Sequence, residues 1–311
     1  MLRRFVSTPL VGYASPVTRK IISCSETPLD LSIKDNFLIV QDGHKVTKVF
    51  VEDVHCLILG HPRVSITANA IQKIISSGGT VLFSDEKHAP LGLVLPLVGN
   101  FEQTKRFQVQ SDLSQSKKDK IWKQFIKAKI LNQARVLQHY TGVDKGLSLM
   151  VKNLRTGDPA NLEAQASRKY WKSLMGDQFR RDRDLEDENL LLNYGYTLIR
   201  SSVARAVVAT GLHPSLGIHH HNKYSNFPLA DDLMEPFRPF VDSLVVEIKN
   251  NGKDFSLNKE NRSKLLGIFH KKCSLAKEDR IISDAIIRVS QSFCSLVIGE
   301  SKSMEFPIWT S

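Results

Sequence analysis

A change of sequence pattern near Phe101 is the feature that most constrains the fold of this 311-residue chain. Before it, short apolar and β-branched runs are separated by turn signals. Asp42-Gly43 between two of these runs favours a tight hairpin turn, because both residue types tolerate positive φ. Thr67 can cap a short helix over residues 68–77. The runs predict strands at residues 21–24, 29–33, 37–41, 45–50, 54–59 and 80–84.

After Phe101 the apolar residues follow the helical period, and few turn signals interrupt the runs. Ser116 with Asp119 resembles a capping box, which predicts a helix from there to about Tyr140. The tail over residues 301–311 is expected to be irregular. Further helices are predicted over residues 161–174, 190–210, 231–249, 259–272 and 277–298.

The two patterns predict an α+β fold with two domains. A small N-terminal β-rich domain is expected over residues 19–100, followed by a larger all-α domain over residues 101–311. This division agrees with the chain length, which exceeds what one ordinary core needs. We expect an unstructured extension over residues 1–18, where no acidic residue occurs.

The composition excludes several classes of protein. With 41% hydrophobic and 24% charged residues, the chain is typical of folded soluble domains and unlike disordered or collagen-like sequences. No apolar stretch approaches the roughly 20 residues of a membrane-spanning helix, so we expect no membrane segment. The four cysteines have neither metal-binding spacing nor the density of a disulfide scaffold, which favours the reducing cytoplasm of a cell.

The charge of the chain is the most informative part of its composition. The formal net charge is +11, and residues 101–160 alone carry twelve basic and five acidic residues. Within this segment Lys120, Lys123 and Lys127 share one face of the predicted helix. Such a row is ordinarily a solvated surface, but here it is also a candidate for contacting a phosphate backbone. Charge alone leaves a nucleic-acid surface and an ordinary basic surface equally open.

The first cluster that could carry chemistry begins at Asp158-Pro159, a typical helix start with Asp158 as the expected N-cap. Glu163 then shares a helix face with Ser167 and Tyr170. Taken alone, Glu163 is more simply explained as a first-turn glutamate favoured by the helix dipole.

The second cluster is a run of three histidines at residues 219–221, in a segment that Pro214 and Gly217 keep irregular. One or two of these imidazoles could bind a metal ion, and a solvated polar loop explains them equally well. The lack of nearby cysteines disfavours zinc.

The third cluster contains Asp232 and Glu235, which are neighbours on a helix and repel each other unless a cation or Arg238 compensates them. Carboxylates together with one imidazole suit a hard ion such as Mg²⁺ or Mn²⁺. In a basic protein, such a site suggests phosphodiester chemistry.

Taken together, these segments resemble the universal CRISPR adaptation integrase, in the form found in type II systems. The resemblance extends over about residues 19–240, and residues 29–40 and 80–90 look like the β-domain of that family. The signatures occur in the family's order and lie at residues 163–171, 192–196, 211–220 and 232–239.

The resemblance implies a catalytic helical domain with a divalent ion, Mg²⁺ or Mn²⁺, bound by Glu163, His220 and Glu235. His220 is chosen because the family's histidine ends a Gly-x-x-His element, which here begins at Gly217. Asp232 lies at a position that is acidic in other branches, and it is a weaker fourth candidate ligand. The candidate DNA-binding residues are Lys120, Lys123, Lys127, Arg168 and Arg238.

The resemblance also implies an activity and partners. The expected enzyme is a metal-dependent endonuclease and integrase of spacer acquisition, which joins the 3′-hydroxyl ends of captured foreign DNA to the leader-proximal repeat. It is expected to form a homodimer through the β-rich domains and a hetero-hexamer with the small second adaptation protein on double-stranded DNA. A type II effector nuclease is a further candidate partner, and the location is the prokaryotic cytoplasm. Two alternatives remain open, a transposon-encoded integrase of the same fold and a non-catalytic DNA-binding scaffold.

Overall fold

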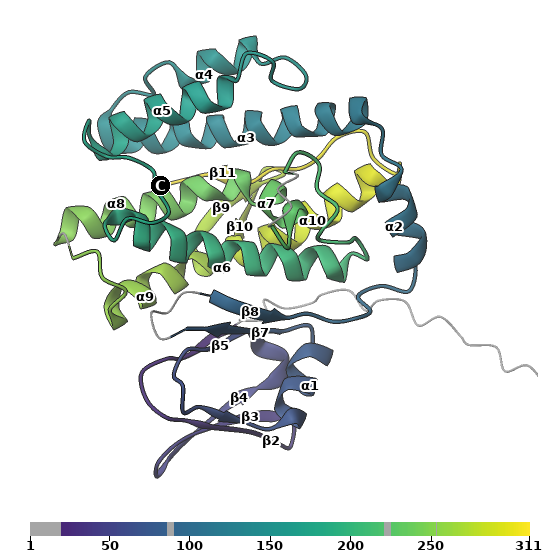
Figure 1. The fold of residues 1–311 in the computed structure, drawn as a ribbon, viewed down its shortest axis with the longest axis vertical. Coiled ribbons are helices and arrows are strands. Elements are labelled where there is room, and N and C mark those ends of the chain that lie inside the picture. Colours follow the sequence, from purple (N-terminus) through teal and green to yellow (C-terminus); the bar gives the residue numbers. More distant parts are fainter. Residues whose placement is uncertain (1–19, 86–89, 221–224, 253) are drawn as a thin grey trace, which may run out of the picture.

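The structure is a computed structural model, and it describes residues 20–85, 90–220, 225–252 and 254–311. The predicted extension over residues 1–18 and the candidate His221 lie outside these ranges. Figure 1 shows the β-rich region at one end of the long axis. A central layer of helices packs on it, and a further layer that contains α3 (Gln115–Thr141) and α5 (Leu162–Met175) lies at the opposite end. The confirmed fold class is therefore α+β.

Two four-stranded sheets build the N-terminal region. One has the order β1-β5-β7-β8, and its first three strands run parallel. The other has the order β4-β3-β2-β6, and its first three strands run antiparallel. All six predicted strands are confirmed to within one residue at each end. The bounds are β1 (Lys20–Cys24), β2 (Asp30–Lys34), β3 (Phe37–Asp42), β4 (Lys45–Phe50), η1 (Val51–Asp53), β5 (Val54–Leu59), β6 (Ser65–Ile66), α1 (Ala68–Ser76), β7 (Thr80–Ser84) and β8 (Pro90–Val94).

Strand β5 connects the two cores of the molecule. Its side chains alternate, so Leu57 and Leu59 enter the core of the β-rich region, whereas Cys56 and Ile58 join the core of the helical region. A strand that is buried on both faces is apolar throughout, which is the pattern of residues 54–59.

The predicted turn at Asp42-Gly43 is wrong by one residue. Asp42 pairs with Lys45, so Gly43 and His44 are the central residues of the turn, and only Gly43 has a positive φ, of 55°. The turn between β2 and β3 has positive φ at both central positions, Asp35 and Asn36, which is the property of a type I′ turn. Short polar side chains tolerate this conformation without glycine.

The helical region has the expected succession of helices. The helix predicted from Ser116 begins one residue earlier, because Ser114 rather than Ser116 accepts the capping hydrogen bond from the Lys117 backbone N–H. The bounds are α2 (Gln103–Ser111), α4 (Leu147–Met150), η2 (Val151–Asn153), α6 (Glu188–Ala209), α7 (Pro228–Leu233), η3 (Glu235–Phe237), α8 (Arg238–Asn251), α9 (Lys259–Leu266), η4 (Gly267–His270) and α10 (Ile282–Val297), together with α3 and α5.

Three of the helix predictions need correction. The helix predicted over residues 231–249 is divided into α7, η3 and α8, because prolines at the start of η3 and of α8 supply no backbone donor to the preceding turn. The helices predicted over 259–272 and 277–298 run into a hairpin of β9 (Lys272–Leu275) and β10 (Glu278–Ile281). With β11 (Ile308–Trp309), in the tail expected to be irregular, these strands form a small sheet within the helical region.

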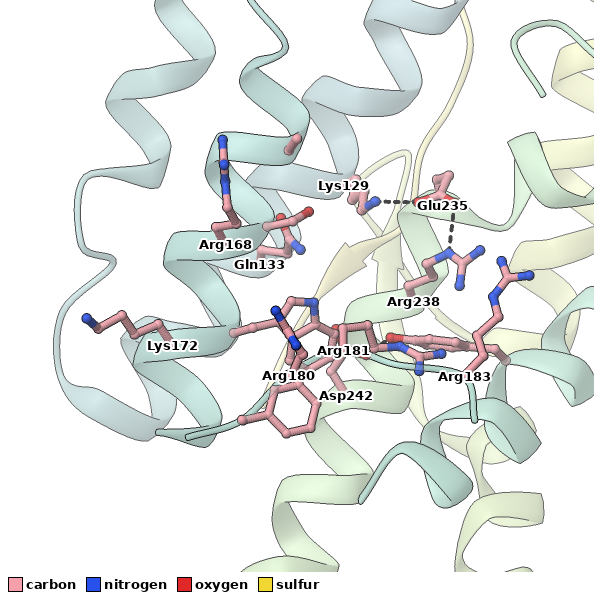
Figure 2. A pocket seen from close by; sticks show the side chains of 15 residues that line it. Lys129, Gln133, Arg168, Lys172, Arg180, Arg181, Arg183, Glu235, Arg238 and Asp242 are labelled. Atoms are coloured by element: carbon pink, nitrogen blue, oxygen red, sulfur yellow. Dashed lines mark hydrogen bonds and ion pairs between the residues drawn. The ribbon is translucent and has the colours of Figure 1, made fainter. Parts of the chain in front are cut away.

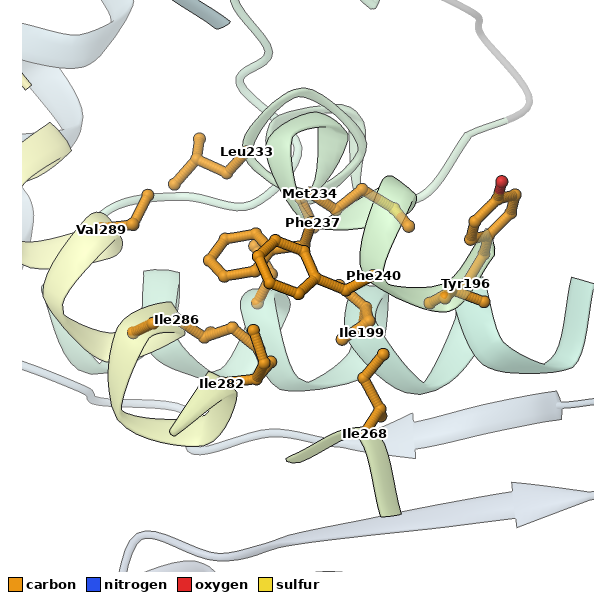
Figure 3. Packing of buried hydrophobic residues seen from close by; sticks show 14 of the residues in the cluster. Tyr196, Ile199, Leu233, Met234, Phe237, Phe240, Ile268, Ile282, Ile286 and Val289 are labelled. Atoms are coloured by element: carbon orange, nitrogen blue, oxygen red, sulfur yellow. The ribbon is translucent and has the colours of Figure 1, made fainter. Parts of the chain in front are cut away.

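The core of the helical region holds the short η3 segment in place. Figure 3 shows Met234 and Phe237 packed against Ile199 of α6 and Ile282 and Ile286 of α10. These side chains are almost completely buried. The backbone around Glu235 is therefore anchored on both sides by apolar contacts.

The four cysteines are free and buried. Among the residues that the structure describes, no helix combines the length and the apolar character needed to cross a membrane.

Candidate active site

Glu163 and Glu235 face each other across a buried lysine that the sequence analysis did not select. Lys129 of α3 places its Nζ 2.6 Å from Glu163 Oε1 and 2.6 Å from Glu235 Oε2. Burial lowers the pKa of Lys129, but the charges of Glu235 and Glu163 outweigh this effect, and its pKa lies above the ordinary value. Two acids separated by 72 positions in the chain thus converge on one positive charge.

Glu163 is positioned by the start of α5. Asp158 accepts hydrogen bonds from the backbone N–H groups of Leu162 and Glu163, at 2.8 and 2.9 Å. The predicted capping role of Asp158 is therefore present, but the helix begins at Leu162 and Asn161 takes the N-cap position. The carboxylate of Asp158 fixes the peptide from which the Glu163 side chain extends.

Glu235 is the more deeply buried of the two acids, with 3% of its surface exposed. Arg238, three residues along, donates from Nε to Glu235 Oε1 at 2.8 Å. Burial by itself would raise the pKa of Glu235, but the charges of Arg238 and Lys129 lower it to about 2. Glu235 is therefore ionised at neutral pH and carries two cationic neighbours.

His220 is held by Asp232 rather than placed beside it as a second ligand. Asp232 is fully buried and accepts hydrogen bonds from the backbone N–H groups of Ile218, His219 and His220, at 2.5, 3.2 and 3.1 Å. Its Oδ1 also lies 2.7 Å from His220 Nδ1. Gly217 permits this turn, because an added Cβ would lie 2.6 Å from the His220 carbonyl oxygen and 3.2 Å from Asp232 Oδ2.

The contact with Asp232 sets the tautomer of His220. A carboxylate accepts only from a protonated nitrogen, so Nδ1 carries the proton and Nε2 of a neutral ring has the lone pair that a metal ion binds. Burial lowers the pKa of His220, but the hydrogen bond to Asp232 and the charges of Asp232 and Glu235 raise it above the ordinary value. Trp122 of α3 stacks on His219 with a ring distance of 4.1 Å and meets His220 edge-on at 5.7 Å.

The donor set fits a hard divalent cation by its chemistry. Glu163 and Glu235 offer carboxylate oxygens at a point already occupied by a positive charge, and His220 offers Nε2. Within the described ranges, however, no three His, Cys, Asp or Glu side chains stand close enough together to hold a metal ion as they are. The Lys129 ammonium lies between the two glutamates, 2.6 Å from an oxygen of each.

A basic cleft of about 600 Å³ opens beside Lys129 and Glu235. Figure 2 shows Lys129, Glu235 and Arg238 at one side of this cleft and Arg168 and Lys172 of α5 at another. The residues after α5 add three arginines, and three aromatic rings complete the wall. The full lining is Lys129, Gln133, Ala164, Ser167, Arg168, Trp171, Lys172, Phe179, Arg180, Arg181, Arg183, Tyr196, Glu235, Arg238 and Asp242.

The guanidinium groups of two arginines of the cleft lie over the ring of Tyr196, a buried residue that is hydrogen-bonded to Asp242. The Arg238 guanidinium lies 4.5 Å and the Arg181 guanidinium 5.4 Å from the centre of the Tyr196 ring. Tyr196 and Tyr170 both donate their hydroxyl hydrogens to Asp242. Burial raises the pKa of Asp242 to about 6, although the two tyrosines oppose the shift.

The structure separates the predicted DNA-binding residues into two groups. Arg168 and Arg238 line the cleft, whereas Lys120, Lys123 and Lys127 of α3 lie outside its lining. Lys120 and Lys127 are exposed, and Lys123 is half-buried.

Sequence reasoning missed Lys129 and the arginines of residues 180–183. A signal for Lys129 was present, because it falls on the apolar face of α3, three residues after Ile126 and four after Phe125. A buried lysine at such a position needs acidic partners. The arginines follow α5 in a segment without helical or strand pattern, and nothing in their spacing links them to Glu235.

Comparison with known proteins identifies the family. The sequence model described as CRISPR associated protein Cas1 matches residues 25–272. The CRISPR-associated endonuclease Cas1 of Neisseria meningitidis serogroup C is 32% identical over 282 residues, which cover 89% of this chain and 92% of that protein. The chain belongs to the Cas1 family. A Cas1 endonuclease of Saccharolobus solfataricus is 26% identical over 244 residues, or 76% of this chain and 77% of that protein.

Solved structures share the fold of this Cas1-family chain. A casposase bound to its integration product superposes with a TM-score of 0.76 at 20% identity, covering 92% of both chains. A Cas1 protein from Thermotoga maritima gives a TM-score of 0.73 at 17% identity, over 94% of this chain and 99% of that one. The predicted family and the predicted α+β class are confirmed. Family membership supports the broad functional class, because the curated relatives are named CRISPR-associated endonucleases.

Proposed function

We propose that this protein is a metal-dependent DNA integrase and nuclease, which joins the 3′-hydroxyl ends of captured DNA to the leader-proximal end of a CRISPR repeat. The observation that carries the proposal is the position of Lys129 Nζ, 2.6 Å from carboxylates of both Glu163 and Glu235. Acids from two distant segments are aimed at one cation at the edge of a basic cleft. This is the electrostatic arrangement that phosphoryl transfer requires.

Glu163, Glu235 and Nε2 of His220 would hold Mg²⁺ or Mn²⁺. Such an ion, when bound, supplies Lewis-acid stabilisation of the charge that develops on the attacked phosphate. Asp232 acts on His220 rather than as a ligand, because both of its oxygens accept hydrogen bonds from the His220 loop. It keeps Nδ1 protonated and so keeps Nε2 available.

The chain's own residues bind and align the DNA. Arg168 and Arg238 offer guanidinium groups to backbone phosphates in the cleft, which positions a strand without reading its sequence. In strand transfer, the 3′-hydroxyl oxygen forms a bond to phosphorus as the bond to the departing 3′-oxygen breaks, and the hydroxyl proton passes to the departing oxygen or to solvent. Water in place of the hydroxyl gives hydrolysis.

The proposed partners rest on the family and on related assemblies. A Cas6-RT-Cas1–Cas2 complex contains a region with a TM-score of 0.71 to this chain at 20% identity, over 94% of this chain and 36% of that one. It supports a complex of this protein with the small second adaptation protein, in the proposed hetero-hexamer on double-stranded DNA. The homodimer through the β-rich region, the type II effector nuclease as a partner and the cytoplasmic location are proposals from the same family resemblance.

A transposon-encoded integrase is a second candidate, because the casposase shares the fold over 92% of both chains. The two functions differ in the DNA that is inserted. An adaptation integrase inserts short duplexes of any sequence beside a repeat, whereas a transposon integrase inserts the ends of its own element. A preference for one fixed terminal sequence in the donor DNA would support this second function.

Strand transfer of a labelled duplex into a repeat-containing plasmid tests the proposal. We expect products with Mn²⁺ or Mg²⁺, none with EDTA, and none for Glu163→Ala or His220→Ala. Glu260→Gln, at an exposed residue of α9, is the matched control and should behave as the native protein. Full activity of both site variants would remove the site assignment and leave a DNA-binding scaffold.

A further inference from the structure

Lys129 is the most deeply buried lysine of the described residues, and it faces the cleft from between two carboxylates. Glu163, Glu235, Lys129 and Arg238 together carry two negative and two positive charges, so the cluster is neutral as it stands. A divalent ion added to the same two carboxylates would bring a third cation into a site of low dielectric. One of the cations must then leave.

Lys129 is the cation that can leave. Arg238 is fixed by its hydrogen bond to Glu235 Oε1 and by the Tyr196 ring beneath it. Among the described residues, Lys129 forms ion pairs with these two carboxylates alone, and its ammonium sits on a flexible four-carbon stem. Its contact with Glu235 Oε2 is short, but that oxygen has no hydrogen bond of good geometry.

The structure also offers a destination for the ammonium. Gln133 lies one turn along α3, on the same helix face, and also lines the cleft. Its Oε1 is buried and has no hydrogen-bond partner among the described residues. A lysine that turned from the glutamates toward Gln133 would satisfy this oxygen and would point its remaining N–H groups into the cleft, where a phosphate would lie.

We propose that Lys129 is a tethered cation that occupies the metal position in the resting protein and moves into the cleft when a divalent ion enters, where its ammonium contacts the transferred phosphate. This inference rests on the proposed function. In the resting state Lys129 keeps two buried carboxylates together, and in the loaded state it becomes a catalytic residue. Metal binding and phosphate binding are thereby coupled through one side chain.

The first experiment measures Mn²⁺ binding by calorimetry for the native protein, Lys129→Met and the control Lys259→Met, at an exposed lysine of α9. Methionine keeps most of the side-chain volume and removes the charge. We expect Lys129→Met to bind Mn²⁺ at least about tenfold more tightly, since the ion no longer competes with the ammonium. Its melting temperature in EDTA should fall by about 5 °C, because the carboxylates lose their partner, and Mn²⁺ should restore it.

Strand transfer by Lys129→Met at saturating Mn²⁺ should be slower by about tenfold or more, because one phosphate contact is missing. Tighter metal binding together with slower transfer separates the proposal from a merely structural lysine. Unchanged or weaker Mn²⁺ binding by this variant would overturn the exchange, and an unchanged transfer rate would overturn the phosphate contact. If the native protein neither bound Mn²⁺ nor transferred strands, the result would contradict the proposed function itself and not only the exchange of Lys129 for the metal ion.

A second measurement needs no variant and covers the case in which Lys129→Met does not fold. Acetylation of lysines in the native protein, read by mass spectrometry, should leave Lys129 protected in EDTA. With Mg²⁺ its labelling should increase severalfold, because the ammonium moves into the open cleft, while the labelling of Lys259 stays constant. Equal labelling of Lys129 with and without Mg²⁺ would contradict the proposal.

Discussion

The two halves of the candidate site neutralise their buried acids in different ways. In the acid half, formed by Glu163, Glu235, Lys129 and Arg238, the counter-charges are side chains that end at an open cleft. In the histidine half, formed by Asp232 and the loop of residues 218–220, the donors are three backbone N–H groups and one imidazole. Side-chain cations can exchange for another cation, whereas backbone donors cannot move without unfolding the loop.

The difference assigns separate tasks to acids that are only three residues apart. Glu235 begins η3 beside the cleft, while Asp232 belongs to α7 and points at the histidine loop. Glu235 is placed to bind an exchangeable metal ion, whereas Asp232 is placed to fix the position of His220. The following substitutions test whether the two halves are as distinct as this geometry indicates.

The largest effect is expected for Glu163→Gln and Glu235→Gln. Each removes a negative charge that would hold the ion, and we expect strand transfer to fall about a thousandfold or more, equivalent to roughly 4 kcal/mol of transition-state stabilisation. The rate of product formation at saturating Mn²⁺ measures this. Glu260→Gln is the control. A loss of activity of less than tenfold in both variants would show that Glu163 and Glu235 do not hold the ion.

Asp232→Asn should have a smaller effect on activity and a larger effect on stability. The amide places N–H groups against backbone donors, so we expect a loss of about 10- to 100-fold in activity or metal affinity, together with a lower melting temperature. Calorimetry with Mn²⁺ and thermal unfolding in EDTA measure the two effects. If Asp232→Asn matched Glu235→Gln in activity while its stability stayed native, Asp232 would belong with the acids as a ligand.

Arg168→Gln and Lys120→Gln compare the cleft with the exposed face of α3. Arg168 lines the cleft, so its loss should weaken duplex DNA binding severalfold and reduce the slope of log affinity against log salt by about 1. Metal binding should not change. Fluorescence anisotropy over a salt series measures both variants, and an equal change for Lys120→Gln would extend the DNA surface to the lysine row of α3.

The smallest effect on activity is expected for Asp242→Asn, which acts through pH. Burial raises the pKa of Asp242 from its ordinary value of 3.8 to about 6, so the folded protein binds a proton there more tightly than the unfolded chain does. The resulting stability is present below pH 3.8 and is lost as the pH rises through about 6.

Relative to Asp242→Asn, the native protein should therefore lose roughly 2 kcal/mol of unfolding free energy between pH 4 and pH 7. Urea unfolding of both proteins at several pH values measures this difference. If the difference in unfolding free energy between the two proteins stayed constant over this pH range, Asp242 would have an ordinary pKa next to Tyr196.

Local patterns predicted the elements of this fold but not how some of them end. Strands such as β5 are apolar on both faces, and α3 has a long helical period, so both are readable from the chain. The hairpin of β9 and β10 was missed because each strand has four residues, and its turn uses Ala276 and Lys277 at positive φ instead of glycine or asparagine. Strand β9 also pairs with β11, a contact between distant segments that local sequence patterns do not predict.

The family resemblance selected Glu163, His220 and Glu235, whereas the residue pattern by itself left Glu163 as a first-turn glutamate and the histidines as either metal ligands or a solvated polar loop. The sequence also set the positive charge and the helical framework that carries these residues. Only the tertiary structure decided that Asp232 turns toward the histidine loop and that Lys129 stands between the two glutamates. Those contacts join α3, α5 and η3, and their energies depend on distance and burial in space, which residue spacing along a chain does not encode.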